Sequence, residues 1–420
     1  MSWQAPPRPE WVQAVNRGEV LPIADVAARP LDPQVLLAEA RAALGLDHHA
    51  GVGAIDGDDR FLEPLAVACA ALEEEAHLTV LGRWITRRYL LRLLEVRFQL
   101  AAYVAADSGV REEEVRSPII VTGAPRTGTT ILYGLLSCDP ALRVPEGWEL
   151  LRPVPPPEPD HFPDPGRLAL ADAELRLMPS VSANLDAIHE YSGRMPKECL
   201  SAMSFELLTE EIAVRYDVPS YHRYLQAADL TPAYEMHRLV LQVLQRRWGP
   251  VQWVLKSPAH LGALPTILSV YPDARIVVTH RDPFTVLPSV SSLVATLRLA
   301  HSDDVDMPTI GRYHADLYGR YLDALVDADE QGVLDPARTH HGRYADFVAD
   351  PMGSVRATYD GVGLELTDPA AVAMERHLAE KPKGHKGEHV YSFDDLGLDR
   401  DAVRARFERY RTHFSVPEEG

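Results

Sequence analysis

The segment that most constrains the fold runs from Ile119 to Leu132. Its β-branched stretch, Ile119–Thr122, is bounded by proline and glycine, which is typical of a short buried parallel strand. The turn that follows, Gly-Ala-Pro-Arg-Thr-Gly-Thr-Thr, leads directly into an apolar helical pattern. Because such a turn aims backbone N–H groups and a helix N-terminus at one point, the segment predicts an anion site.

The side chains of this turn strengthen the prediction of an anion site. Arg126 adds a full positive charge and a two-pronged donor, and the threonines at 127, 129 and 130 add hydroxyl groups. The Walker A pattern G-x-x-x-x-G-K-[ST] fits at Gly123, Gly128 and Thr130, but Thr129 stands where the lysine belongs. Phosphoryl transfer from ATP with Mg²⁺ loses a central group without that lysine. The turn therefore resembles a P-loop that binds a different doubly anionic group, and a P-loop kinase or NTPase is kept as an alternative.

Similar apolar stretches recur along the chain. Residues 253–255 and 275–279 predict two further strands, and a weaker one lies near 339–344. Helical patterns over 235–248 and 261–270 separate them. Strands that alternate with helices predict an α/β fold, a P-loop NTPase-like parallel sheet flanked by helices.

The rest of the chain divides around this predicted sheet. We expect residues 1–115 to form an N-terminal arm, over about 1–35, and a helical region, from Leu62 to Ala106, that packs on the core. Residues 116–420 would form the α/β domain. Its helical insertion at about 160–250 is rich in aromatic residues and is expected to form a lid over a pocket.

Composition limits the partners. The chain has 420 residues, with 61 acidic and 42 basic side chains and a formal net charge of −19. That field repels phosphate backbones and anionic lipid, so we expect neither nucleic acid nor a membrane surface as partner. No stretch approaches the ~18 apolar residues of a membrane span. Three scattered cysteines, Cys69, Cys138 and Cys199, favour a reducing cytoplasm over a disulfide framework or a metal site.

Two more basic residues follow predicted strands. Lys256 ends the strand at 253–255, and Arg281 follows the strand at 275–279, with Ser289 a little further on. Ligands of doubly wound sheets bind at this carboxyl edge. Together with the glycine-rich turn, these fragments resemble the sulfotransferases that use 3′-phosphoadenosine 5′-phosphosulfate (PAPS), above all the bacterial branch called sulfotransferase family 3, which is related to the tyrosylprotein sulfotransferases. The resemblance covers about 117–410 and includes four further fragments, Gly147–Leu151, Pro196–Cys199, Tyr344–Pro351 and Tyr391–Leu398.

The resemblance implies how PAPS would bind. Its 5′-phosphosulfate would lie on the turn from Arg126 to Thr130, which includes Thr127, Gly128 and Thr129. Its 3′-phosphate would contact Arg281 and Ser289. Tyr344 matches a tyrosine that lies beside the adenine in related enzymes, with core packing as the alternative. Lys386 either closes over the nucleotide or belongs to a solvated turn.

The resemblance also implies roles in the transfer of the sulfuryl group, which needs positive donors at the leaving oxygen and a base for the acceptor proton. Lys256 and Arg126 suit the first role. For the base we favour Glu149, with Glu146 as competitor and His189 as a lesser candidate. Glu198 is expected to orient the substrate or to brace the lid.

These observations predict a cytoplasmic enzyme that moves a sulfuryl group from PAPS to a hydroxyl of a small-molecule or lipid-like acceptor. The reaction would be an in-line displacement with a glutamate base and no metal. The alternatives are the kinase or NTPase and a non-catalytic nucleotide-binding protein of the same fold.

Overall fold

A parallel sheet of five strands forms the centre of the molecule, in the order β2-β3-β1-β4-β5. The computed structural model describes residues 3–20, 23–46, 55, 58–182, 185, 191–380 and 391–419. The strands predicted at 119–122, 253–255, 275–279 and near 339–344 are confirmed as β1 (Ile119–Gly123), β3 (Gln252–Lys256), β4 (Arg275–His280) and β5 (Thr339–Arg343). The two-residue strand β2 (Leu142–Arg143) was not predicted.

The register places β1 between β3 and β4. Ile120 is paired with Leu255 on one side and with Ile276 on the other. Alternate side chains of β1, β3 and β4 enter different apolar clusters, because successive residues of a strand face opposite sides of the sheet. Both faces are therefore buried, as a parallel sheet requires.

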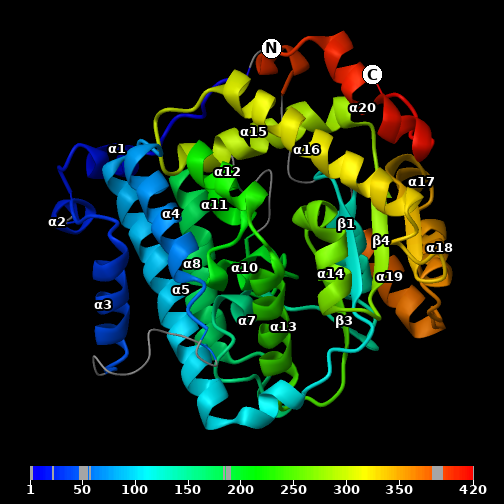
Figure 1. Cartoon of the computed structure of the whole chain (residues 1–420), viewed down its shortest axis with the longest axis horizontal. Coiled ribbons are helices and arrows are strands. Elements are labelled where there is room, and N and C mark those ends of the chain that lie inside the picture. Colours follow the sequence, from blue (N-terminus) through cyan, green and yellow to red (C-terminus); the bar gives the residue numbers. More distant parts are fainter. Residues whose placement is uncertain are drawn as a thin grey trace.

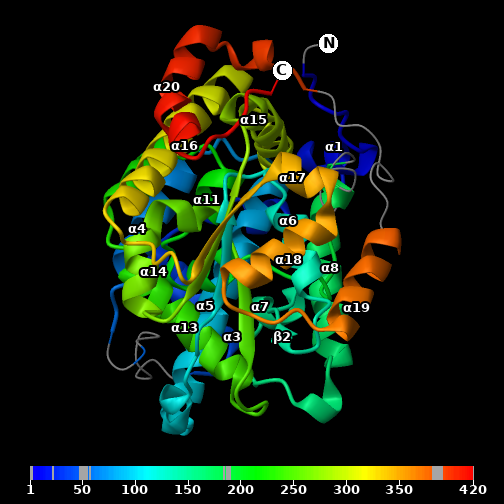
Figure 2. The same cartoon turned by 90° about the vertical axis from the view of Figure 1, so that its right-hand side faces the viewer.

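One face is covered by helices that follow the strands in the sequence. Val121 and Val277 belong to an apolar cluster with side chains of α6, α18 and α19. Figure 2 shows these three helices on the near side of the sheet. The helices on or next to this face are α6 (Thr129–Leu136), α17 (Tyr344–Ala349), α18 (Pro351–Gly361) and α19 (Asp368–Glu380).

The opposite face packs on a larger set of helices. Ile120, Leu255 and Ile276 share a core with apolar residues that run from Leu31 to Val416. In Figure 1 the helices α3, α4, α5, α10, α13 and α14 lie on this side of the sheet, and α15, α16 and α20 lie across one end. In the chain, β3 is followed by η4 (Pro258–Ala263) and α14 (Leu264–Val270), and β4 is followed by α15 (Pro283–Leu299) and α16 (Met307–Glu330). Near the end of the chain come η5 (Phe393–Leu396) and α20 (Arg400–His413).

The insertion between β2 and β3 is built mainly from helices. It contains α7 (Gly147–Leu151), η2 (Pro159–His161), α8 (Pro165–Val181), α10 (Leu200–Met203), η3 (Ser204–Glu206), α11 (Glu210–Arg215), α12 (Pro219–Ala227) and α13 (Thr231–Gln245). Several of its aromatic side chains, including Phe205, Tyr221 and Tyr234, are buried in the large core. These rings therefore help to anchor the insertion to the core.

The N-terminal part contains more helix than its prolines suggested. The region predicted to be helical forms α4 (Leu62–Glu74) and α5 (Val80–Ala106), followed by η1 (Ser108–Glu112). The expected arm contains α1 (Glu10–Asn16) and α2 (Ala24–Ala27), and α3 (Pro33–Ala43) follows. Val12 and Val15 of α1 are buried against Leu81 and Ile85 of α5, and this packing stabilises a helix too short to be stable alone.

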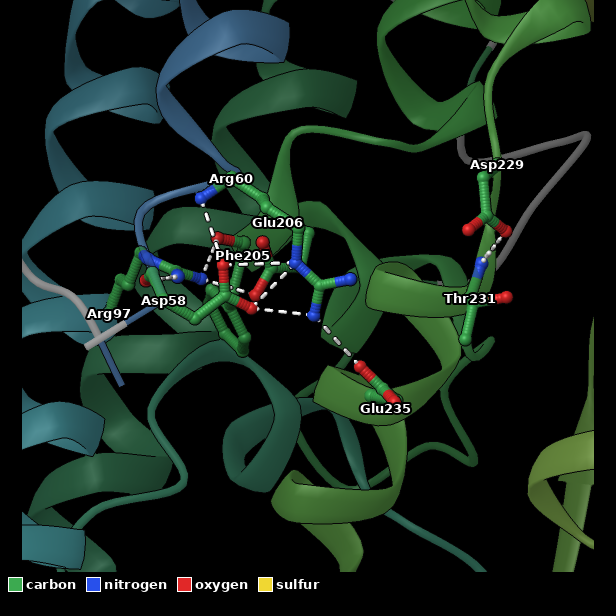
Figure 3. Close-up of polar contacts among 8 residues, drawn as sticks. All are labelled: Asp58, Arg60, Arg97, Phe205, Glu206, Asp229, Thr231 and Glu235. Carbon is green, nitrogen blue, oxygen red and sulfur yellow. Dashed lines mark hydrogen bonds and ion pairs between the residues drawn. The ribbon is translucent and has the colours of Figure 1, made fainter. Parts of the chain in front are cut away.

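Polar contacts join these first helices to the insertion. Arg97 of α5 is 1% exposed and donates to Glu206 Oε1 at 2.5 Å and to the Phe205 carbonyl at 3.2 Å. Figure 3 shows this pair beside a second one, in which Arg60 bridges Asp58 and Glu235 of α13. Because removal of one partner from a buried ion pair costs about 3–5 kcal/mol, the Arg97–Glu206 pair fixes the insertion against α5.

Candidate active site

The glycine-rich turn has the shape that an anion site requires. It joins β1 to α6, and Arg126 (φ +67°) and Gly128 (φ +92°) both adopt left-handed backbone conformations. A Cβ atom at Gly128 would lie 3.2 Å from Cδ2 of Tyr344, so a side chain there would be both strained and crowded. The predicted turn into a helix beginning at Thr129 is confirmed.

The threonines of the turn differ in what they do. Thr127 is 1% exposed, and its hydroxyl donates to the Ala124 carbonyl at 2.7 Å and lies 2.5 Å from the Thr279 hydroxyl. Thr129 is also buried, whereas Thr130 is exposed. The Thr127 side chain therefore holds the turn in shape, whereas the Thr130 hydroxyl accepts from Lys256 Nζ at 3.2 Å.

The three residues predicted for the two anionic ends of a nucleotide lie together. Arg126 Nε donates to Ser289 Oγ at 3.2 Å, and Arg281 Nη1 donates to the Arg126 carbonyl at 3.1 Å. The guanidinium of Arg281 also lies 4.1 Å from the ring centre of Tyr344. Figure 1 shows α15, which carries Ser289, at the end of β4. The strand ends thus bring residues far apart in the sequence into one site.

Arg281 has an acidic partner that the sequence analysis did not find. Its Nε donates to Glu419 Oε2 at 2.9 Å, and its Nη2 lies 2.9 Å from the same oxygen. This contact shows that the exposed edge of the Arg281 guanidinium accommodates an anionic group. A phosphate offers oxygen acceptors of the same kind, so the side chain fits the role predicted for it.

Lys256 forms the second basic centre of the site. Its side chain is 3% exposed, and Nζ donates to Thr130 Oγ1 at 3.2 Å. Nζ also forms an ion pair with Oε1 of Glu198, which enters from the insertion. The backbone N–H of Cys199 donates to the Lys256 carbonyl at 3.0 Å and fixes this segment against the end of β3. Glu198 is therefore the carboxylate that lies against the predicted catalytic lysine.

Glu149, the predicted base, has a different environment. It is 0% exposed; Oε1 accepts from Arg143 Nη2 at 2.5 Å and Oε2 accepts from the Glu146 backbone N–H at 2.9 Å. The second contact belongs to a capping box at the start of α7. Burial raises the pKa of Glu149, and Arg143 opposes that shift. Both carboxylate oxygens are thus committed to contacts that hold the chain between β2 and α7.

Glu146, the competitor, is less enclosed. Its Oε2 accepts from Trp148 Nε1 at 2.7 Å and lies 3.4 Å from Arg194 Nε. Burial raises the pKa of Glu146 to about 7. The backbone of Glu146 bridges Pro196 in the segment that leads to Glu198, so the two glutamates belong to adjoining segments.

Two predicted site residues, His189 and Lys386, lie outside the described residues. Over the described ranges, no group of three or more His, Cys, Asp or Glu side chains is arranged to hold a metal ion. Within the same part of the chain, none of the helices has the length and apolar composition that crossing a membrane requires.

Comparison with known proteins decides the family. The model of the sulfotransferase family matches residues 118–368, which include the turn, Lys256, Arg281 and Ser289. The chain belongs to the sulfotransferase family. The resemblance described from the sequence is confirmed, the enzyme is a sulfotransferase, and the match favours sulfuryl transfer over the kinase or NTPase alternative.

Solved sulfotransferases share the whole architecture. The crystal structure of sulfotransferase STF1 from Mycobacterium tuberculosis H37Rv superposes with a TM-score of 0.77 at 31% identity, over 89% of this chain and 97% of that one. Sulfotransferase STF9 from Mycobacterium avium superposes with a TM-score of 0.81 at 27% identity, over 94% and 99%. The predicted α/β fold is confirmed by both.

A curated relative carries a substrate in its name. The omega-hydroxy-beta-dihydromenaquinone-9 sulfotransferase Stf3 of Mycobacterium bovis is 30% identical to this sulfotransferase over 271 residues, which are 63% of this chain and 67% of the relative.

Proposed function

We propose that this sulfotransferase transfers the sulfuryl group of PAPS to a hydroxyl of a lipid-like acceptor. The observation that carries the proposal is the convergence of Arg126, Ser289 and Arg281 at one end of the sheet. Two arginines and a serine in contact suit a ligand with two separate anionic groups, whereas a single phosphate needs fewer cations. The 5′-phosphosulfate would lie on the turn and the 3′-phosphate against Arg281 and Ser289, with Tyr344 beside the nucleotide.

We assign to Lys256 the role of assisting the departure of the nucleotide. It lies against Thr130 at the start of α6, where the 5′-phosphosulfate is proposed to bind. In the transfer, the acceptor oxygen forms a bond to sulfur while the bond from sulfur to the bridging oxygen of PAPS breaks. The leaving oxygen gains negative charge, and the ammonium of Lys256 and the guanidinium of Arg126 stabilise it.

We propose Glu198 as the base that takes the acceptor proton. Its carboxylate is paired with Lys256, whereas both oxygens of Glu149 are used by Arg143 and the backbone of Glu146. When Lys256 turns to the bridging oxygen of the donor, the Glu198 carboxylate loses its contact with Lys256 and can accept a proton. Glu149 then acts as a positioning residue for the wall of the site. Glu146 stays the second candidate for the base, because burial raises its pKa to about 7.

The proposal for a lipid-like acceptor is supported by the relative Stf3, whose name gives a hydroxylated menaquinone derivative as its substrate. The buried aromatic residues of the insertion share one apolar core with Cys199, the residue that follows Glu198. We place the reaction in the cytoplasm, because Cys69, Cys138 and Cys199, all within the described residues, form no disulfide.

Thermal unfolding with nucleotides tests the donor. 3′-Phosphoadenosine 5′-phosphate (PAP), the product left by PAPS, should raise Tm more than AMP or ATP with Mg²⁺ at equal concentration. A ligand at 100 times its Kd stabilises the native state by ~2.7 kcal/mol, so the shift is measurable. A larger shift with ATP and Mg²⁺ than with PAP would refute the assignment. Transfer of labelled sulfate from PAPS to hydroxylated isoprenoid quinones would then test the acceptor class.

A further inference from the structure

The segment Ser415–Glu419, which follows α20, reaches back to the nucleotide-binding residues. Its last described side chain, Glu419, contacts Arg281 through both carboxylate oxygens, with Nε 3.2 Å from Oε1 and 2.9 Å from Oε2. The Arg281 side chain is only 17% exposed, so few directions are open from which a ligand can reach its guanidinium. Glu419 occupies one of them.

Further contacts hold the segment in this position. The backbone N–H of Glu419 donates to Asp282 Oδ2 at 2.9 Å, and Thr285 Oγ1 donates to the Glu419 carbonyl at 3.3 Å. Val416 is 5% exposed and packs in the large core, and its N–H donates to the Arg411 carbonyl at 2.8 Å. The segment is therefore anchored at one end by an apolar side chain and at the other by Arg281 and its neighbours.

The neighbouring acidic residue has a separate set of partners. Glu418 Oε1 accepts from Arg411 Nη1 at 2.8 Å, and Glu418 Oε2 lies 3.4 Å from Arg404 Nη1. Both arginines belong to α20. Glu418 thus attaches the segment to its own helix, whereas Glu419 alone contacts a residue of the proposed donor site.

We propose that Glu419 competes with the 3′-phosphate of the donor for Arg281, so that donor binding must displace the segment. This inference rests on the proposed function, because it requires a nucleotide whose 3′-phosphate contacts Arg281. The carboxylate uses the Nε and Nη2 groups, the edge of the guanidinium with which arginine binds phosphate oxygens in pairs. A phosphate carries more negative charge than a carboxylate and can therefore replace it.

The competition should change the apparent Kd of PAP by a measurable factor. The apparent Kd of a ligand equals its intrinsic Kd divided by the fraction of protein that is competent to bind. A segment bound nine-tenths of the time would therefore weaken PAP binding about tenfold. Nucleotides without a 3′-phosphate do not need Arg281, so their affinity should not depend on Glu419.

The test is calorimetric titration of Glu419→Gln with PAP and with AMP. Glutamine keeps the size of the side chain and removes its charge. We expect PAP to bind about tenfold more tightly than to the wild type, and AMP to bind equally well to both. The matched control, Glu418→Gln, removes an equal charge one residue away and should leave the affinity for PAP unchanged.

Each other outcome overturns the inference. Unchanged PAP binding to Glu419→Gln would mean that the contact offers no competition, and weaker binding would mean that Glu419 completes the site. If Glu419→Gln bound PAP and AMP more tightly by the same factor, or if Glu418→Gln bound PAP as tightly as Glu419→Gln does, the effect would come from the lower negative charge of the protein and not from competition at Arg281. If the wild type and Glu419→Gln both fail to bind PAP, the proposed function itself fails, which is a different result from unequal affinities.

Discussion

Two pairs of a cation and a carboxylate lie at the carboxyl end of the sheet, and they differ in burial and in chemistry. Lys256 and Glu198 form the first, and Arg281 and Glu419 the second. The lysine side chain is 3% exposed, whereas the arginine side chain is 17% exposed. The first pair lies at the end of β3 and the second at the end of β4, on opposite sides of β1.

The chemical difference between lysine and arginine agrees with the role proposed for each side chain. An ammonium group is a compact point charge that can move between partners, which suits contact with an oxygen whose charge changes during the reaction. A guanidinium is a planar donor that holds two oxygens at once, which suits a phosphate that stays bound. Under the proposed function, the same kind of ion pair serves transfer at one strand end and binding at the other.

Removal of the carboxylate of the first pair should have the largest effect. Glu198→Gln keeps the shape of the side chain but cannot accept the acceptor proton, so turnover should fall ~10²–10⁴-fold. PAP affinity, measured by calorimetry, should change little. Turnover near that of the wild type would instead favour Glu146, Glu149 or His189 as the base.

Removal of the cation of the first pair should come next. Lys256→Ala deletes a donor to the leaving oxygen, and such a deletion costs ~2.7–4 kcal/mol of barrier. Single-turnover kinetics with PAPS should show a slower transfer step, with a smaller loss of nucleotide affinity. If affinity falls more than the transfer rate, Lys256 binds the donor without assisting the reaction, and the contrast between the two pairs disappears.

The second pair should show the reverse pattern. Arg281→Ala removes charge-assisted hydrogen bonds, so PAP binding should weaken by ~1.5–3 kcal/mol in calorimetry. AMP, which lacks the 3′-phosphate, serves as the control and should lose much less. An equal loss for both nucleotides would mean that Arg281 acts on the general shape of the site.

Substitution of Glu149, which lies outside both pairs, should have the smallest effect on turnover. Glu149→Gln leaves Arg143 without its buried carboxylate, and loss of one partner from a buried ion pair costs about 3–5 kcal/mol of stability. We expect lower stability in urea, with the turnover of the folded protein nearly unchanged at saturating substrate. A large loss of turnover in fully folded protein would restore Glu149 as the base.

The convergence of Arg126, Lys256 and Arg281 at one end of the sheet was predictable, because each of them follows a predicted strand. Arg126, Lys256 and Arg281 each stand at or just after a strand that the apolar pattern marks, and parallel strands bring their carboxyl ends to one edge. The turn also has its own local signals in Gly123 and Gly128. The two-residue strand β2 has too few residues for a pattern, and α1 forms through packing against α5, which no local pattern reveals.

The choice of carboxylate was harder, because distance along the chain does not measure distance in space. Glu149 was favoured for its place after the first helix of the α/β unit, but its spacing from Glu146 is that of a capping box, which the sequence analysis overlooked. Glu198 reaches Lys256 from the insertion, and the two are separated by 58 positions in the sequence. That contact depends on how the insertion packs, and only the three-dimensional structure reveals it.

Because β1 lies between β3 and β4, the sheet fixes the distance between the ends of these two strands. Neighbouring strands are ~4.7–4.9 Å apart, so the ends of β3 and β4 are separated by roughly 10 Å through backbone hydrogen bonding alone. Changes in the length of surface loops leave that spacing intact. A donor that contacts both Lys256 and Arg281, as the proposed function requires, must be long enough to span this distance.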